Sequence, residues 1–518
     1  MNIAQLTIDI VLFLLYTIAG VFLIMWILRF WQMYVNQKHM NDVNSKWKIL
    51  EILLPREITK SPQAFELIAT NFLQTGGVST WFHRKFKGNL PAFFSLEIAS
   101  LEGVIHFYIR THEKFANLIT SNVYAQYPGV EVIEVEDYAT KLRYEHNKKN
   151  SLFWGNSFIL SNKHTLYPEV KDEHGKVKEE KIDIPGDYLP IRTYIDMGLE
   201  KDPKEEFKND PLVQVIESLA SIGKGQYAAV QLLVQDEKSS FNNSGGETSK
   251  KFLATYVDEK THKHLTLENL AKLRIAQLRE RNIKKGTVVK DAYGYIEYEK
   301  PVQIGKDVEG KPIFGEPKPK THQEDKVEKV KEMEITAEDK AELEAIGNKL
   351  SKPLLRCVLR AVSVQKKEAQ GMFVQESLSM MKPFSYNGYN SFSLKNVSDP
   401  YDYPWQDTLK RRKGWRAEEI FDAFVEREGF YPHIGSRTGL DKWEDIFFFP
   451  YKGYVRRIWR MIIEGIVYPY EHPAASEVFV LNIEEVATLF HFPGLTAATP
   501  TLPRIDSKKG VAPVNLPQ

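Results

Sequence analysis

A run of apolar residues near the N-terminus constrains the fold of this chain more than any other sequence feature. Residues 10–28 (IVLFLLYTIAGVFLIMWIL) contain no charged side chain. Their number is close to the roughly 20 residues that a helix needs to cross the hydrocarbon core of a bilayer. The run therefore predicts a transmembrane anchor over residues 1–35. A cleaved secretory signal and a buried core helix are the alternatives, but a signal would also carry a basic first segment and a small-residue cleavage site.

Charged and aromatic residues around this run predict its orientation. No Lys or Arg precedes it, whereas Arg29 and three lysines from Lys38 to Lys48 follow it. The positive-inside bias therefore places the C-terminal side in the cytoplasm. The candidate residues for the membrane interface are Trp26, Arg29, Trp31 and Tyr34.

Composition supports folded domains in a reducing compartment. The 518 residues leave room for two or three domains after the anchor, and 43% of them are hydrophobic. The single cysteine, Cys357, cannot form an internal disulfide, which agrees with a cytoplasmic location. A formal net charge of +1 argues against a general polyanion binder but leaves a local basic surface open.

Alternating apolar residues predict a first α+β unit over residues 91–235. Two alternating strands flank the turn at Glu102-Gly103, and Asp210 followed by Pro211 is typical of a helix start. The expected elements are strands near 94–99, 105–110, 130–135 and 227–235, a helix capped by Thr111 and a helix capped by Asp210.

A charged stretch at 236–334 separates this unit from a second unit at 335–492. The stretch is rich in Ser, Asn and Gly and then in Lys, Glu and Pro, which predicts a partly flexible linker. The expected elements are a basic helix at 265–281, a hairpin at 294–315, a helix capped by Thr336, a buried strand at 354–364, a helix at 368–382, a strand at 391–397 and helices at 417–428 and 453–466.

The predicted fold class is therefore α+β. The N-terminal transmembrane helix is followed by a juxtamembrane segment at 36–90 and by two small helix-covered sheet domains, for which a ferredoxin-like arrangement is the economical candidate. A Pro-rich tail at 493–518 ends the sequence. Because the tail has few large apolar residues, we expect a chain truncated after Pro493 to keep its fold.

Catalytic and metal-binding signatures are absent from the sequence. It contains no GxxxxGKS/T phosphate loop, no HExxH, no paired CxxC and no GxSxG. The segment GSRTGLDK at 435–442 lacks the glycine-lysine-hydroxyl ending that holds phosphate and Mg²⁺. We therefore predict no catalytic residue, no cofactor and no metal, and a chain that is not an enzyme.

Two clusters of basic and aromatic residues are candidates for contact with lipid or nucleic acid. Basic side chains neutralise phosphates, and aromatic rings stack on bases. Given the predicted anchor, anionic lipid or simply a solvated face is favoured over DNA. The candidate residues are Arg411, Arg412, Trp415, Arg416, Arg456, Arg457 and Arg460.

Two stretches resemble the membrane-proximal, non-motor region of bacterial type IV secretion or conjugation-type DNA-transfer coupling ATPases. The first, at 96–138, contains YAQYP followed by GVEVIEVEDY. The second, NIEEVATLFHFP at 482–493, continues into the passage TPTLPRIDSKKGVAPVNLP. In that family this passage leads into a P-loop motor, and no P-loop motif is present here. Taken alone, both motifs are most simply structural, as a helix stop and as core residues.

The resemblance implies the function that we expect. The chain would be a membrane-anchored, non-catalytic platform subunit of a type IV secretion or conjugation-like translocation machine. Its expected partners are a separately encoded P-loop ATPase motor, the lipid bilayer and an oligomeric assembly, with DNA as a further candidate. The expected location is the bacterial plasma (inner) membrane, single-pass, with cytoplasmic C-terminal domains. A membrane-anchored enzyme and a membrane-tethered DNA-binding adaptor are the rival functions.

Overall fold

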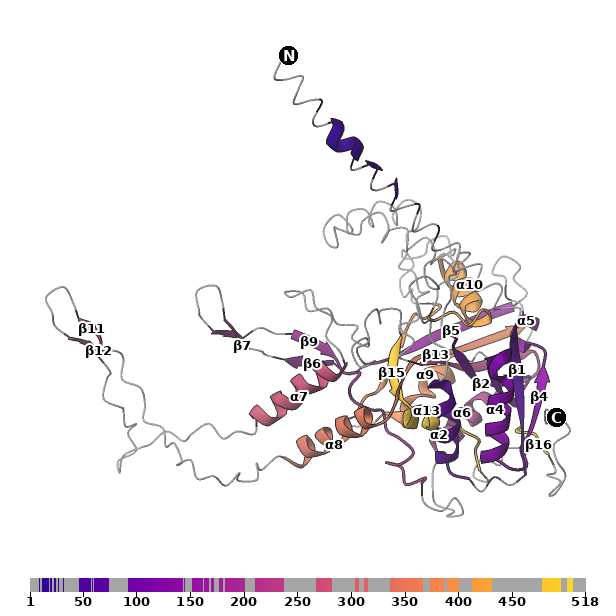
Figure 1. Cartoon of the computed structure of the whole chain (residues 1–518). Coiled ribbons are helices and arrows are strands. Elements are labelled where there is room, and N and C mark those ends of the chain that lie inside the picture. The colour runs from indigo at the N-terminus through magenta and orange to yellow at the C-terminus, as the bar shows by residue number, and fades with distance from the viewer. Residues whose placement is uncertain are drawn as a thin grey trace.

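The computed structural model of the chain is an α+β fold built on one large, mostly antiparallel sheet (Figure 1). The structure describes residues 9, 12–17, 19–20, 23–24, 27, 31, 46–56, 58, 60–73, 92–142, 144, 151–161, 163–166, 169–171, 177–179, 182–200, 210–236, 267–281, 303–306, 312–314, 336–366, 373–385, 389–399, 412–430, 478–494 and 501–505.

The described helices cover the sheet or extend from its end. They are α2 (Gln63–Ala69), α4 (Glu113–Gln126), α5 (Tyr138–Lys141), α6 (Pro211–Ala220), α7 (Leu267–Arg281), α8 (Ala337–Ser351), α9 (Gln375–Ser379), α10 (Arg412–Val425) and α13 (Ile483–Leu489), with 3-10 turns η1 (Thr70–Leu73) and η5 (Lys382–Phe384).

The strands of the large sheet come from both halves of the chain. They are β1 (Trp47–Pro55), β2 (Phe94–Leu101), β3 (Val104–His112), β4 (Glu131–Val135), β5 (Ser151–Leu160), β10 (Gln226–Asp236), β13 (Leu354–Lys366), β14 (Phe392–Lys395), β15 (Phe479–Asn482) and β16 (Arg504–Ile505). Three separate two-stranded sheets pair β6 (Lys163–Leu166) with β9 (Ile182–Pro185), β7 (Glu169–Lys171) with β8 (Val177–Glu179), and β11 (Gln303–Lys306) with β12 (Pro312–Phe314).

One sheet replaces the two predicted sheet domains. Its order is β14-β5-β13-β10-β2-β3-β1-β16, with β15 beside β13 and β4 beside β1. Strand β13, from the second predicted unit, lies between β10 and β5 of the first and pairs with β10 from Gln226↔Gln365 to Asp236↔Leu355. Both β10 and β13 are buried along nearly their whole length, as central strands are. The prediction of two separate sheet domains is therefore wrong.

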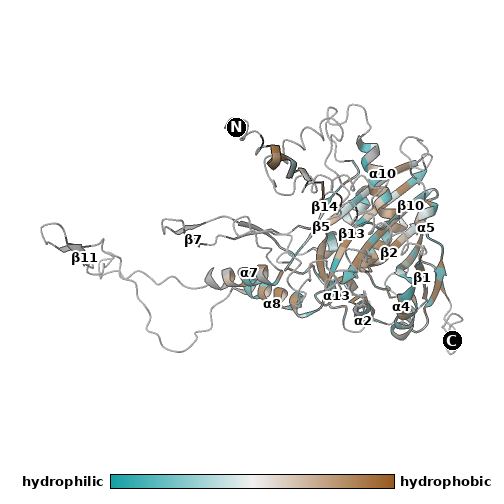
Figure 2. Ribbon diagram, turned by 45° about the horizontal axis from the view of Figure 1, so that its top comes forward, coloured by the Kyte–Doolittle hydropathy of each residue, from teal (hydrophilic) through white to brown (hydrophobic). Residues whose placement is uncertain are grey.

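The two faces of the sheet carry different layers. Helices α2, α4, α6, α9 and α13 lie together on one side (Figure 1), over an apolar face that includes Leu96, Leu232 and Leu359. The other face is covered by α10, which packs its phenylalanines around Ala99, Ala229 and Val362. Hydrophobic residues are concentrated on β2, β10 and β13 between these layers (Figure 2). Most of the core therefore lies on the side of the five helices.

Several local predictions are confirmed by the structure. Strands β2 and β3 form the expected hairpin, whose turn places Glu102 and Gly103 at positive φ. Asp210 caps α6 by accepting a hydrogen bond from the Leu212 amide at 2.9 Å. Thr336 caps α8 in the same way. The predicted linker helix is α7, which contacts α8.

Other local predictions need correction. Helix α4 is capped by His112 rather than Thr111, because the His112 ring accepts a hydrogen bond from the Lys114 amide. The described helix within the predicted span 368–382 is limited to α9 and is followed by η5. The predicted helix at 453–466 lies outside the described residues.

The predicted transmembrane helix is also wrong. Over the part of the chain that the structure describes, no helix combines the length and the apolarity needed to cross a membrane. The prediction of a single-pass protein of the plasma membrane is corrected with it.

The first part of the Pro-rich tail belongs to the fold. Thr501 accepts a hydrogen bond from the Ile105 amide at 3.0 Å, and Leu502 is only 4% exposed. Strand β16 then runs parallel to the end of β1, and the Arg504 guanidinium donates to the carbonyls of Pro55, Pro493 and Gly494. These contacts argue against our expectation that truncation after Pro493 leaves the fold intact.

Candidate functional site

A row of polar side chains crosses the sheet on the face covered by α10. Cross-strand pairing places one residue of each strand in this row, between otherwise apolar neighbours. Charged residues are almost never buried unless they are paired. Such a row at the centre of a core is therefore the strongest candidate for a functional arrangement. Its members, in order across β1, β3, β2, β10, β13 and β5, are Glu51, Tyr108, Glu97, Gln231, Arg360 and Ser157.

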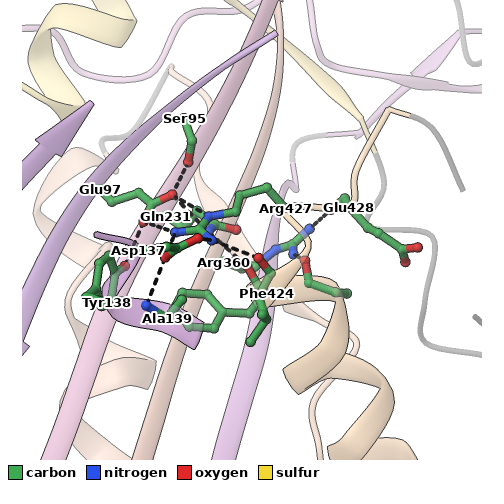
Figure 3. Close-up of polar contacts among 12 residues, drawn as sticks. Ser95, Glu97, Asp137, Tyr138, Ala139, Gln231, Arg360, Phe424, Arg427 and Glu428 are labelled. Carbon is green, nitrogen blue, oxygen red and sulfur yellow. Dashed lines mark hydrogen bonds and ion pairs between the residues drawn. The ribbon is translucent and has the colours of Figure 1, made fainter. Parts of the chain in front are cut away.

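Glu97 lies in the middle of this row and is fully buried. Figure 3 shows the polar side chains that surround it. Its carboxylate forms a two-point ion pair with Arg427, with Nε to Oε1 at 3.0 Å and Nη2 to Oε2 at 3.2 Å. The Tyr138 hydroxyl donates to Oε2 at 2.7 Å, and the Ser95 hydroxyl and Gln231 amide donate to Oε1 at 2.5 and 3.2 Å. Every side of the carboxylate is thus occupied.

Arg427 joins Glu97 to a second carboxylate. Its Nη2 donates to Asp137 Oδ1 at 2.9 Å, and its Nη1 pairs with Oδ2 of the same residue. Asp137 is the N-cap of α5, where it also accepts a hydrogen bond from the Ala139 amide. One guanidinium therefore connects β2 with the start of α5.

The pKa of Glu97 records how completely it is paired. Burial would raise this pKa, but the charge and hydrogen bonds of Arg427, with the hydrogen bonds from Ser95 and Tyr138, lower it from 4.5 to about 2. The carboxylates raise the pKa of Arg427 in turn. The pair is therefore ionised at neutral pH and is unsuited to exchanging protons there.

The backbone of Arg427 closes the C-terminal end of α10. The Arg427 amide donates to the Phe424 carbonyl and the Glu428 amide to the Ala423 carbonyl, which is the Schellman pattern. The central position of this pattern requires positive φ and usually holds glycine, but here it is Arg427 with φ 54°. Arg427 therefore adopts a backbone conformation that is unfavourable for a residue with a side chain. The same residue supplies the guanidinium of the ion pair.

Buried polar groups also bind the last carbonyls of α10 and a carbonyl of the turn that follows it. Arg360 donates to the carbonyls of Ala423 and Glu428, and Gln231 donates to that of Phe424 at 3.2 Å. Arg427 donates to the carbonyl of Val425 at 2.8 Å. Two guanidinium groups thus face the negative end of the helix dipole. The arrangement fixes the end of α10 on the sheet.

A second buried ion pair lies in the motif NIEEVATLFHFP. Glu485 and Lys349 are both 0% exposed, with Lys349 Nζ 3.2 Å from Glu485 Oε1. Lys349 also donates to the carbonyls of Leu189 and Val480 at 3.1 and 2.8 Å. Glu485 completes a capping box with Asn482 at the start of α13. This pair connects α8 to α13.

The two motifs that resemble the coupling ATPases are in contact in the structure. Tyr127 of YAQYP packs edge to face on Phe492, with ring centroids 4.9 Å apart. His491 lies 2.8 Å from Asp210, the cap of α6. Both motifs are therefore part of the core, in line with the structural interpretation of their residues.

The predicted basic clusters are only partly described. Arg416 in α10 donates to the Val397 carbonyl at 2.6 Å, and its neighbour Lys413 pairs with Asp399. Arg412 and Trp415 also lie in α10. Of the residues predicted for the membrane interface, Trp31 is described, and it is 48% exposed. The structure thus turns Arg416 inward rather than leaving it on an open basic surface. Trp26, Arg29, Tyr34, Arg411, Arg456, Arg457 and Arg460 lie outside the described residues.

Sequence reasoning missed the buried polar row. Arg360 stands inside the apolar run LLRCVLRAVSV, and a charge within a buried strand is a signal that could have identified it. Glu97 alternates with apolar residues and therefore looks solvent-facing. Arg427 sits at a helix end, where a basic residue is ordinary.

An open pocket of about 430 Å³ lies elsewhere, at the turn between β2 and β3. It is lined by turn residues 102–104, the end of α6 and the tail residues Thr501 and Pro503. Its carboxylate, Glu102, already accepts hydrogen bonds from the Gly225 amide and the Tyr227 hydroxyl. In the described parts of the chain, no three His, Cys, Asp or Glu residues are grouped so that they could hold a metal ion.

Comparisons with known proteins leave the family open. No family model, no curated protein and no solved structure matches the chain. The likeness to coupling ATPases therefore stays a prediction from the two motifs.

Proposed function

We propose that this chain is a non-catalytic platform subunit that positions a separately encoded P-loop motor in a type IV secretion or conjugation-like translocation machine. The proposal rests on the folded sheet and its C-terminal strand. It combines the sequence resemblance with one structural observation, the attachment of residues 501–505 to the sheet.

That attachment carries the proposal. Strand β16 lies along β1, and Arg504 ties it to three backbone carbonyls. Residues beyond Ile505 therefore start from a fixed point at the edge of the sheet. In the family that the chain resembles, the matching passage leads into the motor. A fixed exit point is what a platform needs to hold a motor in one place.

The use of the buried charges also supports a platform rather than an enzyme. Glu97, Arg427 and Arg360 hold α10, and Lys349 and Glu485 hold α13. All five side chains are directed at other parts of the fold. Networks of this kind stiffen a scaffold, whereas a general acid or base needs a pKa near the working pH.

The rival function, a DNA-binding adaptor, gains no specific support from the described residues. Of its candidate cations, Arg416 is bonded to a backbone carbonyl, and the adjacent Lys413 is paired with Asp399. Engaged cations are poor phosphate ligands because a new contact must first break the old one.

Truncation at two sites tests the proposal. A chain ending at Ile505 keeps β16 and should unfold at the same temperature as the full chain, yet it should no longer co-purify with a P-loop ATPase from its own cells. A chain ending at Pro493 loses Leu502 and Arg504 and should unfold at a lower temperature, since a fully buried Leu contributes about 1.5–3 kcal/mol.

A scrambled tail is the matched control. Residues 506–518 in shuffled order keep length and composition, and they should also fail to retain the ATPase. Mass spectrometry must identify a protein with a GxxxxGKS/T motif in the sample from the full chain. If no such protein is recovered, or if the chain ending at Ile505 retains it fully, the proposed docking role of the tail is wrong.

A further inference from the structure

Arg110 on β3 differs from two other buried arginines, Arg427 at the end of α10 and Arg360 on β13. It is 8% exposed, and its terminal nitrogen Nη1 is buried without a hydrogen-bond partner. Arg427 binds two carboxylates and Arg360 binds two backbone carbonyls. A buried guanidinium without an acceptor is costly, and native structures rarely leave one so.

A second unpaired donor lies beside it. The Arg110 guanidinium sits over the Trp47 ring, 4.2 Å from its centroid, and the indole Nε1 is also buried without a hydrogen-bond partner. Ser95, directly opposite Arg110 in the register, donates its hydroxyl to Glu97. The two adjacent side chains therefore present buried N–H donors, at Arg110 Nη1 and Trp47 Nε1, for which the fold supplies no acceptor.

From this geometry we propose that Arg110 and Trp47 form a binding site for a small oxyanion, a phosphate or carboxylate group. Guanidinium groups bind both because their planar N–H donors match pairs of oxygens. The indole N–H can add one further hydrogen bond. This inference is independent of the proposed platform function, because it concerns a ligand and not the motor.

The surroundings suit an anion better than a neutral ligand. Burial and the nearby charge of Arg427 lower the pKa of Arg110 to about 9, against the opposing charges of Glu97, Asp137 and Glu426, so the group stays cationic at neutral pH. The wall beyond Trp47 is aromatic, with Phe93 at 4.9 Å and then Phe430 at 5.8 Å between ring centroids. A low-dielectric wall strengthens the attraction between a cation and an anion.

The half-buried Trp47 ring covers the Arg110 guanidinium, so the ring must move to admit an ion. Trp47 is the first residue of β1, where the strand begins, and its ring meets His112 edge to face at 5.9 Å. We therefore expect ion binding to change the fluorescence of Trp47.

Calorimetric titration of the full chain with sodium phosphate and, separately, sodium acetate tests the site at fixed ionic strength. Arg110→Met keeps an apolar stem over the indole but removes the donors, and should weaken binding about tenfold or more. Lys48→Met is the matched control, because Lys48 faces Thr111 in the register and pairs with exposed Glu134. It removes the same charge outside the site and should leave binding unchanged.

The two ions distinguish the sources of the ligand. Binding of phosphate alone assigns a phosphorylated ligand, and binding of acetate as well assigns a carboxylate group. The proposal is overturned if the full chain binds neither ion, or if Arg110→Met binds as tightly as the unmodified chain.

If Arg110→Met fails to fold, Trp47→Phe tests the oxyanion site instead. The fluorescence change produced by the ion should disappear in that variant, and its persistence at full amplitude would refute the site.

Discussion

Glu97 and Glu485 are equally buried carboxylates whose pKa values move in opposite directions. Each is 0% exposed and each is paired with a cation. The pKa of Glu97 is lowered to about 2, whereas burial outweighs the pairing at Glu485 and raises its pKa. Because the two carboxylates are equally buried, the opposite directions of their pKa shifts must come from their hydrogen-bond and ion-pair partners.

The partners differ in geometry and number. Glu97 faces a guanidinium that meets both of its oxygens, with three side-chain donors besides. Glu485 faces a single ammonium group that also serves two backbone carbonyls, and it accepts hydrogen bonds from the backbone amides of Ile191 and Asn482. A bidentate guanidinium compensates the lost hydration of a carboxylate better than a shared ammonium. Glu97 is therefore the stronger anchor, and the end of α10 depends on it.

Loss of Arg427 should have the largest effect. Arg427→Met leaves Glu97 buried and unpaired, which should lower the free energy of unfolding by about 3–5 kcal/mol. Urea denaturation at neutral pH measures this. Lys413→Met near the start of α10 removes an exposed ion pair and should lower the free energy of unfolding by less than about 1 kcal/mol. Equal losses in the two variants would show that the buried pair does not stabilise the fold as argued.

The pH dependence of Glu97 gives the next largest effect. The pKa of Glu97 in the folded chain, about 2, lies below its ordinary value of 4.5, so its contribution is present above about pH 4.5 and is lost as the pH falls through about 2. At neutral pH this contribution is about 3 kcal/mol. Glu97→Gln should therefore be less stable than the unmodified chain at pH 6, with the gap closing towards pH 2. A gap that is constant across this range would contradict the ion pair.

Loss of Lys349 should cost less than loss of Arg427. Lys349→Met leaves Glu485 without its cation, but a carboxyl group with an already raised pKa can take up a proton instead of staying charged. We expect a loss of about 1–3 kcal/mol at neutral pH, and a smaller loss at lower pH, where Glu485 is protonated. Urea denaturation at several pH values measures both.

Lys352→Met provides the control for this variant. Lys352 bridges Glu66 and Glu484 but is 29% exposed, so its removal should lower the free energy of unfolding by about 1 kcal/mol or less. A loss at Lys349 that grows as the pH falls would contradict the raised pKa of Glu485.

Local signals predicted much of the secondary structure but not the sheet. Caps and alternation are properties of neighbouring residues, so the hairpin β2–β3, the start of α6 and strand β13 could be predicted. Strand pairing is not local: β13 joins two strands of the first predicted unit. Strand β1 was missed because WKILEILLP followed the supposed anchor and was assigned to a juxtamembrane segment.

The buried network lay beyond sequence reasoning for the same reason. Glu97 and Arg427 are 330 residues apart, and each is ordinary in its own local pattern. The apolar run at 10–28, with its flanking charges and aromatic residues, predicted a membrane-spanning helix that the described residues do not show. The composition of a segment indicates how much apolar surface it can bury. Which other segment it packs against depends on the tertiary fold.

Two tyrosine hydroxyls extend the comparison to the smallest expected effect. Tyr138 donates its hydroxyl to Glu97 at 2.7 Å, whereas the buried hydroxyl of Tyr127 has no hydrogen-bond partner. Tyr138→Phe should therefore lower the free energy of unfolding by about 1–3 kcal/mol, because a hydrogen bond to a charged group is lost. Tyr127→Phe removes an uncompensated polar group and keeps the ring on Phe492, so stability should stay equal or rise by up to about 1 kcal/mol. Thermal denaturation of both variants measures the pair. A clear loss in Tyr127→Phe would mean that this hydroxyl is bonded in solution, and the motif YAQYP would then contribute more than packing to the core.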